Sequence, residues 1–482
     1  MPRLRSRWTI RAVFSALLVL TAATVVGSFV ASGVDSPGGP VAVEEQFAAA
    51  RDHQLPSEHW STARVRAATA GQRNVTVVAT QGFSISDERA ELAAFTANGT
   101  IIYYEDRYRS YFDVDPVQGT RYTVEVVAAN HLTGADCAAF DRDRCTRNLV
   151  VRINLTTGER ERVYSALTPR IYNSRWHDVD RLDAHHLVVA DISGDGVYAV
   201  DTRTGNVTWE WHAERRWSHA AGGPSTDWTH INDVSVLPDG RIMVSVRNMD
   251  SVVFLSVENG TAHVQRNWTL GSDDAHDVLF EQHNPDYIPA DRGGPAILLA
   301  DSENTRVEEY HRVDGQWVRA WRWRDVRLQW PRDADRLPGG NTLVVDSHGD
   351  RVLEVAPNGG VQWAAHVALP YDVERLGTGD ESATGRARQS RDHGGRRIVS
   401  PVNRIWLTLK DLVPPVETNS LLYLAPSWVR FADLVFGVAF VSTGLVWGSC
   451  ELYWSRHSLV SVAGDGLTAL GTTARSFGRR LL

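Results

Sequence analysis

The sequence predicts an all-β fold, a six-bladed β-propeller with an N-terminal and a C-terminal transmembrane helix. Two observations lead to this prediction: a phrase that recurs about every 45–55 residues, and one uncharged apolar run on each side of the repeats. Each repeat holds four short alternating runs rich in Val, Ile and Trp, separated by turns rich in Gly, Asp, Asn and Pro. Such a four-stranded unit at this spacing is the blade of a propeller.

The repeated phrase is clearest at residues 176–182, which read Trp-His-Asp-Val-Asp-Arg-Leu. Related copies begin at residues 111, 228, 275 and 330, after an earlier copy that spans about 74–104. Six copies over about residues 71–366 predict six blades. A β-sandwich or a solenoid is the alternative, but the long period and the Trp that recurs in the last run of each copy favour the propeller.

The rest of the chain is expected to form anchors and linkers. The expected segments are an N-terminal anchor (1–34), a linker with a short helix (35–70), the propeller (71–366), a polar linker and amphipathic helix (367–425), a second transmembrane helix (426–454) and a basic tail (455–482). Residues 367–396 are polar enough to predict a solvated, flexible linker. The amphipathic stretch 398–413 is expected to lie on the membrane surface or to close the domain.

Two apolar runs predict the compartment. The run from Ala12 to Val34 is long enough for a ~30 Å hydrocarbon core, which needs ~20 residues, and four arginines precede it. A cleaved signal peptide is the alternative. The run from Leu434 to Cys450 has aromatic residues near both ends, and a buried core helix is the alternative. Because basic residues flank both runs on their outer sides, we expect both termini in the cytoplasm, the propeller on the extracellular side of the cell membrane, and the lipid bilayer as a partner.

The charge balance excludes one class of partner. The 482 residues carry 50 Lys and Arg against 58 Asp and Glu, a net charge of −8, and Lys410 is the only lysine. Nucleic-acid binding wants a basic patch, so no nucleic acid is expected. An acidic surface with Arg in place of Lys fits a protein from a halophilic archaeon, although a GC-rich genome gives the same bias.

Cysteines and sequons agree with an extracytoplasmic propeller. Cys137 and Cys145 lie in one polar loop, which predicts a disulfide; a metal site is the alternative, but no nearby cysteine pair completes it. Six asparagines begin Asn-x-Ser/Thr and are candidate glycosylation sites. They are Asn74, Asn98, Asn154, Asn206, Asn259 and Asn267.

One column of the repeat alignment carries candidate chemistry. Immediately before the Asp of the repeated phrase stand Phe112, His177, His276 and Arg332, and the copy at 228 offers His230. The first strands of propeller blades line the central channel, so we expect these histidines and Arg332 around the axis. The alternative is that each residue caps a strand by bonding to the next blade.

Arg247 stands out at the end of a second strand, where other copies have small or apolar residues. It is expected near His230 and Asn232 on the adjacent strand. A guanidinium suits an oxyanion such as sulfate or phosphate. His177, His230 and His276 could instead form a three-histidine metal site, but an arginine aimed at the same place disfavours a cation. No metal and no cofactor are therefore expected.

These motifs resemble a known family. Thr-His-Ile-Asn-Asp-Val from residue 229, Ser-Val-Arg at 245–247, Leu-Gly at 270–271 and His-Asp-Val at 276–278 resemble the arylsulfate sulfotransferases, especially the membrane-anchored versions of halophilic archaea. The resemblance covers most of the propeller, best from about 176 to 365. It implies a six-bladed propeller that transfers a sulfuryl group from an aryl sulfate donor to a phenolic acceptor. The implied route is ping-pong, without a nucleotide donor, through a sulfated histidine.

The resemblance also implies roles for individual residues. His276 falls on the nucleophile, His230 and His177 on the acid–base residues, and Arg247 with Asn232 on the groups that hold the sulfuryl oxygens. Arg332 is expected to bind substrate, and so is His283, which is also the second candidate for the nucleophile. The alternative function is a non-catalytic cell-surface propeller that binds partners or glycans; the histidine column favours the enzyme.

Overall fold

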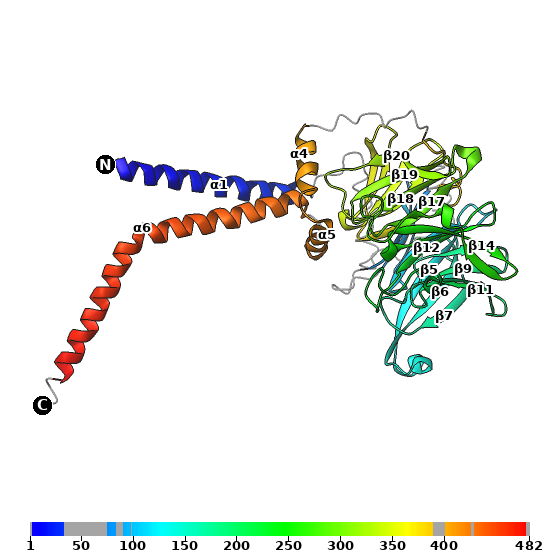
Figure 1. The fold of residues 1–482 in the computed structure, drawn as a ribbon, viewed down its shortest axis with the longest axis horizontal. Helices are drawn as coiled ribbons and strands as arrows, with labels where there is room; N and C mark the ends of the chain where they lie inside the picture. Colours follow the sequence, from blue (N-terminus) through cyan, green and yellow to red (C-terminus); the bar gives the residue numbers. More distant parts are fainter. Residues whose placement is uncertain are drawn as a thin grey trace. The chain divides into compact units, whose positions relative to one another are not determined.

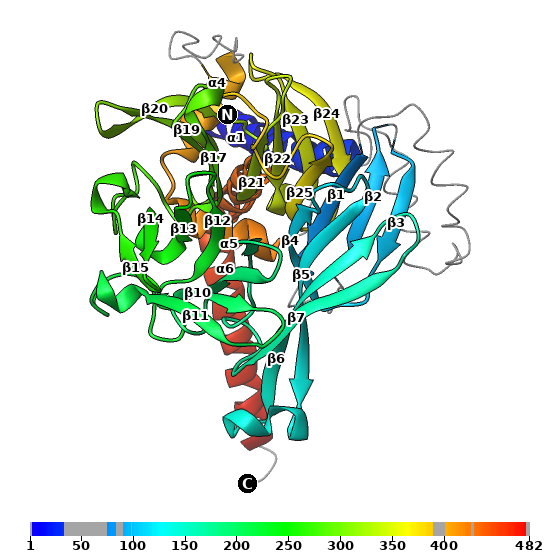
Figure 2. The same cartoon turned by 90° about the vertical axis from the view of Figure 1, so that its right-hand side faces the viewer.

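The computed structural model describes residues 2–32, 75–82, 90–97, 99–388, 401–425 and 429–478. They fall into two compact units, one over Ser36–Ser427 and one that combines Met1–Asp35 with Trp428–Leu482. The first unit is built from six antiparallel sheets arranged around a common centre (Figure 2). This arrangement confirms the predicted all-β, six-bladed propeller.

Three blades come from the first half of the propeller. The blade that joins both ends holds β25 (Pro370–Leu376), β1 (Val75–Thr80), β2 (Leu92–Thr96) and β3 (Ile101–Glu105). The next holds β4 (Ser110–Pro116), β5 (Thr123–Thr133), β6 (Arg144–Asn154) and β7 (Arg160–Thr168). The third holds β8 (Val179–Arg181), β9 (His186–Asp191), β10 (Gly196–Asp201) and β11 (Val207–His212).

Three blades follow in the second half. The fourth holds β12 (Ile231–Val236), β13 (Ile242–Val246), β14 (Ser251–Glu258) and β15 (Thr261–Val264), with β16 (Leu270–Gly271) paired to β14. The fifth holds β17 (His283–Ile288), β18 (Ala296–Asp301), β19 (Arg306–Val313) and β20 (Gln316–Trp323). The sixth holds β21 (Pro331–Arg336), β22 (Thr342–Asp346), β23 (Arg351–Val355) and β24 (Val361–His366).

The ring closes where β25 pairs with β1, from Val75 opposite Leu376 to Ala79 opposite Asp372. The predicted propeller ended at residue 366 and therefore did not include β25. The segment after it was expected to be a solvated linker, but Ser382 is buried, accepts a hydrogen bond from the Arg336 backbone and donates one to the Asp286 carboxylate. Residues 370–388 therefore belong to the propeller.

Burial along the strands explains why four strands make one blade. Inner strands such as β1, β13 and β22 are buried at every position, because neighbouring blades cover both of their faces. Outer strands such as β11 alternate between exposed and buried positions and bring Trp209 and Trp211 against the next blade. The apolar inner runs and alternating outer runs of the sequence therefore map onto depth within each blade.

The aspartate of the repeated phrase ties the blades together. The Asp372 carboxylate accepts the backbone N–H of Val114 at 2.8 Å, and the Asp178 carboxylate accepts that of Val234 at 2.7 Å. In each pair the acceptor lies on or directly before the innermost strand of one blade, and the donor lies on the innermost strand of the next blade. One alternative above was that the residue before this aspartate caps its strand by bonding to the next blade. The aspartate makes that contact instead, so the side chain of the residue before it can face the axis.

The disulfide prediction is confirmed. β5 and β6 extend into a long hairpin whose tip is the 3-10 helix η2 (Gly134–Phe140), and Cys137 is bonded to Cys145 there. Among the sequons, Asn206, Asn259 and Asn267 are exposed and Asn154 is partly buried. Asn74, Asn98 and the expected helix in 35–70 lie outside the described residues. Glycosylation stays a prediction.

Two short helices complete the propeller unit. α4 (Pro401–Lys410) lies within the predicted amphipathic stretch, and α5 (Pro415–Leu424) follows it. Lys410 is buried and its ammonium donates to the Leu328 carbonyl at 2.9 Å. The Asn419 side chain of α5 donates to the Glu303 carboxylate at 2.8 Å. Both helices are thus attached to the blades.

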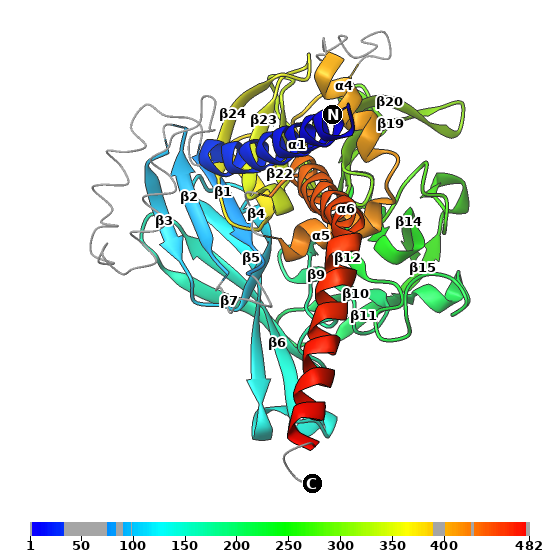
Figure 3. The same cartoon turned by 90° about the vertical axis from the view of Figure 1, so that its left-hand side faces the viewer.

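The second unit is a pair of helices, α1 (Pro2–Ser32) and α6 (Phe431–Gly478), which contact each other (Figures 1 and 3). Arg11 and Glu451 form a two-pronged ion pair at 2.5 and 2.6 Å. The segments Arg7–Gly27 and Phe431–Ser455 are long and apolar enough to cross a membrane. They overlap both predicted anchors, although α6 continues to Gly478, where a separate tail was expected.

Candidate functional site

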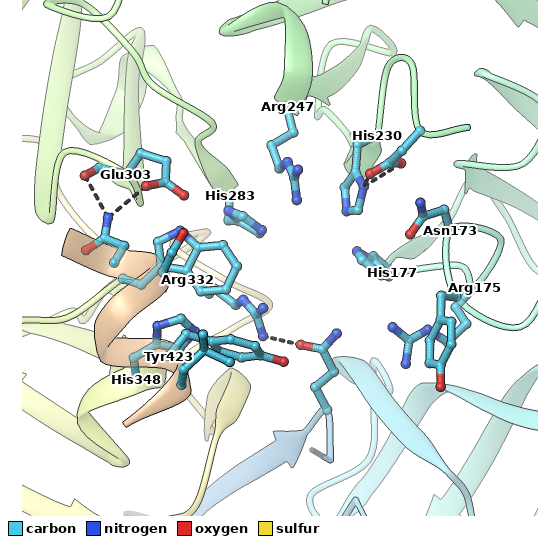
Figure 4. Close-up of a pocket in the computed structure, with 17 residues that line it drawn as sticks. Asn173, Arg175, His177, His230, Arg247, His283, Glu303, Arg332, His348 and Tyr423 are labelled. Carbon is cyan, nitrogen blue, oxygen red and sulfur yellow. Dashed lines mark hydrogen bonds and ion pairs between the residues drawn. The ribbon is translucent and has the colours of Figure 1, made fainter. Parts of the chain in front are cut away.

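A cavity of about 420 Å³ lies where loops and strand ends of several blades meet, and α5 contributes to its wall. Of the seven predicted catalytic and substrate-binding residues, five line it. Figure 4 shows these five side chains pointing toward one common space: His177, His230, Arg247, His283 and Arg332. The sequence-predicted cluster therefore exists, with two exceptions.

His276 is the first exception. It lies in the turn between β16 and β17, its side chain is 44% exposed, and its ring stacks on Phe280 and lies 3.3 Å from the Asp250 carboxylate. The prediction that His276 stands in the first strand of its blade is wrong. Residues 275–278 repeat the motif in sequence but do not occupy the same place in the blade. The innermost strand, β17, begins at His283, and the aspartate of this strand that lies near the axis is Asp286.

Asn232 is the second exception. It is fully buried, does not line the cavity, and donates its amide N–H to the Gln282 carbonyl at 3.0 Å. It therefore fixes the backbone just before His283. Because Asn232 does not line the cavity, the prediction that it holds the sulfuryl oxygens does not fit this structure.

The neighbours of His283 determine which of its two ring nitrogens carries the proton. Its Nδ1 lies 2.8 Å from the Ser302 hydroxyl and 3.1 Å from the Glu281 carbonyl. Ser302 donates its only proton to the Pro331 carbonyl at 2.6 Å, so it must accept from His283. Nδ1 therefore carries the proton, and Nε2 keeps its lone pair for the cavity. Burial, with Arg332 and Arg247 nearby, holds the pKa of His283 well below its usual value.

His230 is paired with a residue that the sequence reading missed, Asp227. Both Asp227 oxygens lie 2.8 Å from Nδ1 of His230. Burial raises the pKa of Asp227, but the hydrogen bond from His230 and the positive charges of His230 and Arg247 outweigh it, and the pKa falls below its usual value. Asp227 is thus a carboxylate that accepts from Nδ1–H, and Nε2 of His230 is left to exchange a proton.

The backbone at His230 is strained. Its φ is +46°, a conformation that side-chain-bearing residues rarely adopt and that persists only where the surroundings impose it. Here Thr229 donates both its backbone N–H and its hydroxyl to the Asp195 carboxylate, at 3.1 and 2.7 Å. The strain aims the imidazole into the cavity. Burial and then Arg247 lower the pKa of His230, and Asp227 opposes them.

His177 lies against His230, with ring centroids 5.1 Å apart. Its ring stacks on Phe112 at 4.3 Å, and its Nδ1 lies 3.0 Å from the Tyr371 hydroxyl. Phe112, His177, Arg332 and Tyr371 all precede the aspartate of the repeated phrase, so most of the predicted column does gather at the axis. Burial and the charges of neighbouring cationic residues hold the pKa of His177 well below its usual value.

Three guanidinium groups give the cavity positive charge. Arg247 lies 3.2 Å from Glu281, whereas Arg175 and Arg332 have no carboxylate within 4.0 Å in the described part of the chain. Arg332 instead lies over the rings of Trp330 and Tyr371, at 4.5 and 4.8 Å. Burial lowers the pKa of both Arg175 and Arg332 to about 10, so both stay charged at neutral pH. Such a cavity favours an oxyanion.

A second, much smaller cavity of about 10 Å³ lies beside His177 and is acidic. Aspartates on or directly before the innermost strands line it, at least one from each blade: Asp113, Asp115, Asp178, Asp233, Asp286, Asp333 and Asp372. Burial raises the pKa of Asp178 to about 7 and that of Asp286 to about 8. Oxygens of Asp286, Asp333 and Asp335 lie within 4.8 Å of one another.

Residues 65–284 match the model of the arylsulfotransferase (ASST) family. The matched segment carries His177, His230, Arg247 and His283, and ends one residue after His283. Arg332 and α5 lie beyond it. The match covers slightly less than half of the chain.

Solved structures give a weaker likeness. A periplasmic gluconolactonase from Pseudomonas aeruginosa is 15% identical, with a TM-score of 0.43, and the alignment covers 63% of this chain and 99% of that one. A protein of unknown function from Bacteroides caccae is 11% identical, with a TM-score of 0.43 and coverages of 63% and 99%. A virginiamycin B lyase from Staphylococcus aureus is 7% identical, with a TM-score of 0.35 and coverages of 61% and 85%. No curated protein matches the chain.

Proposed function

We propose that this protein transfers a sulfuryl group from an aryl sulfate to a phenol by a ping-pong route through a sulfated His283. The observation that carries the proposal is the fixed tautomer of His283, which leaves Nε2 unprotonated in a cavity that also holds Arg247 and Arg332. The ASST match supports the substrate class. A non-catalytic scaffold gives no reason for this convergence of buried histidines and arginines.

In the first half-reaction, the Nε2 lone pair of His283 attacks the sulfur of the aryl sulfate. An N–S bond forms, and the S–O bond breaks with its electron pair leaving on the phenolate oxygen. His230, protonated at Nε2, gives its proton to this oxygen, so a neutral phenol departs. The positive charge of the sulfated ring is stabilised at Nδ1–H by the Ser302 hydroxyl and the Glu281 carbonyl, which both accept from it.

In the second half-reaction, the acceptor phenol gives its proton to Nε2 of the now neutral His230. The phenol oxygen attacks the sulfur, and the electron pair of the N–S bond returns to His283. Asp227 stabilises the imidazolium that forms on His230, 2.8 Å away. The enzyme returns to its starting protonation state, so one proton serves both steps.

Arg247 and Arg332 are the groups that would hold the sulfuryl oxygens. Charge spreads over these oxygens as the S–O bond breaks, and fixed guanidinium groups stabilise it without reorganising. His177 packs against His230 and is bonded to Tyr371, so in this proposal it positions His230 rather than exchanging the proton itself.

The test is to incubate the purified full-length protein with 4-nitrophenyl sulfate alone. We expect a burst of 4-nitrophenolate that matches the enzyme concentration, and a sulfated peptide that contains His283 in mass spectra. A burst without label on any histidine would exclude the covalent route. Absence of turnover with every phenol added would exclude the activity.

We also propose that the two apolar helices anchor the protein in a membrane with the propeller on the outer side and both ends of the chain in the cytoplasm. The arginines before Arg7–Gly27 and the disulfide in the propeller support this orientation. The acidic, lysine-poor composition supports a source in a salt-rich environment, such as a halophilic archaeon.

A further inference from the structure

His348 is a cavity residue for which the proposed reaction has no role. It lies in the 3-10 helix η7 (Ser347–Gly349) after β22, in the turn that corresponds to the one holding Arg247 in the fourth blade. Its side chain is one of those that line the cavity (Figure 4), and the residue is only 9% exposed. Neither ring nitrogen has a hydrogen-bond partner in the described part of the chain.

Such a pair of nitrogens is costly without a ligand. Burial, with Arg332 nearby, holds the pKa of His348 well below its usual value, so the ring is neutral and offers one N–H donor and one lone pair. A buried polar group without a hydrogen-bond partner destabilises the folded protein, because it has lost its hydrogen bonds to water. A phenylalanine would fill the same space without that cost. The two unpaired ring nitrogens of His348 therefore indicate that this side chain binds a polar group of a ligand.

The ring of His348 forms part of an aromatic wall. It lies 4.4 Å from Trp330 and 4.9 Å from Tyr423 of α5, measured between ring centroids. Trp330 also meets His283, at 5.7 Å between ring centroids. Trp330 therefore lies beside both histidines, and an aromatic substrate whose oxygen reacts at His283 has the Trp330 and Tyr423 rings to pack against.

The backbone conformation and the hydrogen bonds around this aromatic wall hold its rings in place. Trp330 has a φ of +52°, a strained conformation for a residue with a large side chain. α5, which supplies Tyr423, is held on the propeller by two hydrogen bonds from Asn419 to Glu303, to its carbonyl at 3.0 Å and its carboxylate at 2.8 Å. The wall thus combines blade residues with a helix outside the repeats.

We propose that His348, Trp330 and Tyr423 form a ring-binding subsite that selects phenols carrying a second hydroxyl group, which His348 binds through its ring nitrogens. This inference rests on the proposed function, because the same cavity binds the acceptor in the second half-reaction. A hydroxyl both donates and accepts, and a neutral imidazole offers the complementary acceptor and donor. A site built to bind a hydroxyl discriminates strongly against an analogue that lacks it.

The experiment is a competition between hydroquinone and 4-methylphenol, which are similar in size and differ by a hydroxyl in place of a methyl group. Full-length protein in detergent is given 4-nitrophenyl sulfate with equal concentrations of both acceptors. The ratio of the two sulfated products, measured by mass spectrometry, equals the ratio of their kcat/KM values. It does not depend on the first half-reaction.

For the wild-type protein we expect a preference for hydroquinone of at least about tenfold after division by two for its equivalent hydroxyl groups. His348→Phe keeps the ring and removes the nitrogens, so the preference should fall to within about threefold. His348→Gln keeps a donor and an acceptor and should retain part of it. His185→Phe, an exposed histidine in the turn before β9, is the control and should leave the ratio unchanged.

The outcomes separate the two proposals. A normal 4-nitrophenolate burst with no preference in the wild-type protein, or a preference that survives in His348→Phe, would overturn the subsite and leave sulfuryl transfer intact. Absence of the burst in the wild-type protein would overturn both.

Discussion

The carboxylate of Asp227 accepts a hydrogen bond from Nδ1 of His230, with both of its oxygens 2.8 Å from that nitrogen. This contact is the acid–base centre of the site, because it fixes the tautomer of His230 and stabilises its protonated form. Asp227 lies three residues before His230, so one short segment before β12 supplies both groups.

Asp227→Asn should therefore slow transfer to phenols by about 10²-fold, the size expected for weakened general base catalysis. Without the carboxylate, only Glu281 opposes the effects of burial and Arg247 on His230, so its pKa falls further. Since the acceptor step needs neutral His230, the acidic limb of kcat/KM for the acceptor should move to lower pH. The measurement is kcat/KM for one phenol between pH 4 and 8.

Asp183→Asn is a matched control. Asp183 also lies three residues before its histidine, and its carboxylate oxygens lie 2.8 and 2.9 Å from Nδ1 of His186. This pair is outside the cavity and has solvent access. Activity and its pH profile should not change in this variant. An unchanged pH profile in Asp227→Asn would show that Asp227 only holds the loop.

The nucleophile is tested by replacing each of two histidines, seven positions apart, with alanine. His283→Ala should abolish the 4-nitrophenolate burst and the sulfated peptide, because the nitrogen that would bond to sulfur is removed. His276→Ala should keep both, since His276 is half exposed and lies outside the cavity. Label in His283→Ala, or loss of the burst in His276→Ala only, would return the role to His276.

Of the seven residues predicted from the sequence to form the site, five meet in the cavity, because the repeat period places equivalent positions at the axis. The prediction failed for His276 because the repeated phrase occurs at 275–278, in the turn before β17, whereas β17 itself reads His-Asn-Pro-Asp-Tyr-Ile and carries no clear copy of the phrase.

Other site residues were within reach of the sequence. Tyr371 precedes Asp372-Val373 just as His177 precedes Asp178-Val179, and it was missed because the segment was assigned to a linker. Tyr423 could not be predicted in this way, since α5 lies outside the repeats and its contact with His348 is purely tertiary.

The membrane topology can be tested with protease on intact cells. If the propeller is outside and both ends are inside, protease should digest the propeller and leave a C-terminal tag protected. Opening the cells before digestion should remove the tag and serves as the control. Loss of the tag in sealed cells would contradict the proposed orientation.

The acidic axis predicts how stability depends on pH. Burial raises the pKa of Asp178 and Asp180 to about 7 and that of Asp286 to about 8, so the folded protein holds protons there that the unfolded chain releases above about pH 4. Where the folded state binds more protons, the free energy of unfolding falls as pH rises. The stabilising protons are present at low pH and are lost as pH passes through 7 and 8.

The buried histidines act in the opposite direction, since their lowered pKa makes the folded state bind fewer protons, but only below about pH 6.5. Between pH 6.5 and about 7.5 the carboxylates should set the slope, and the melting temperature at constant salt should fall. At higher pH Lys410, whose pKa burial lowers to about 8, acts in the opposite direction. Asp286→Asn should flatten this fall, because the amide fills the same space without releasing a proton. Asp239→Asn, on an exposed turn, should leave the slope as it is. A melting temperature that rises over this range would mean that the axial carboxylates are ionised in the folded protein and held by bound cations instead of protons.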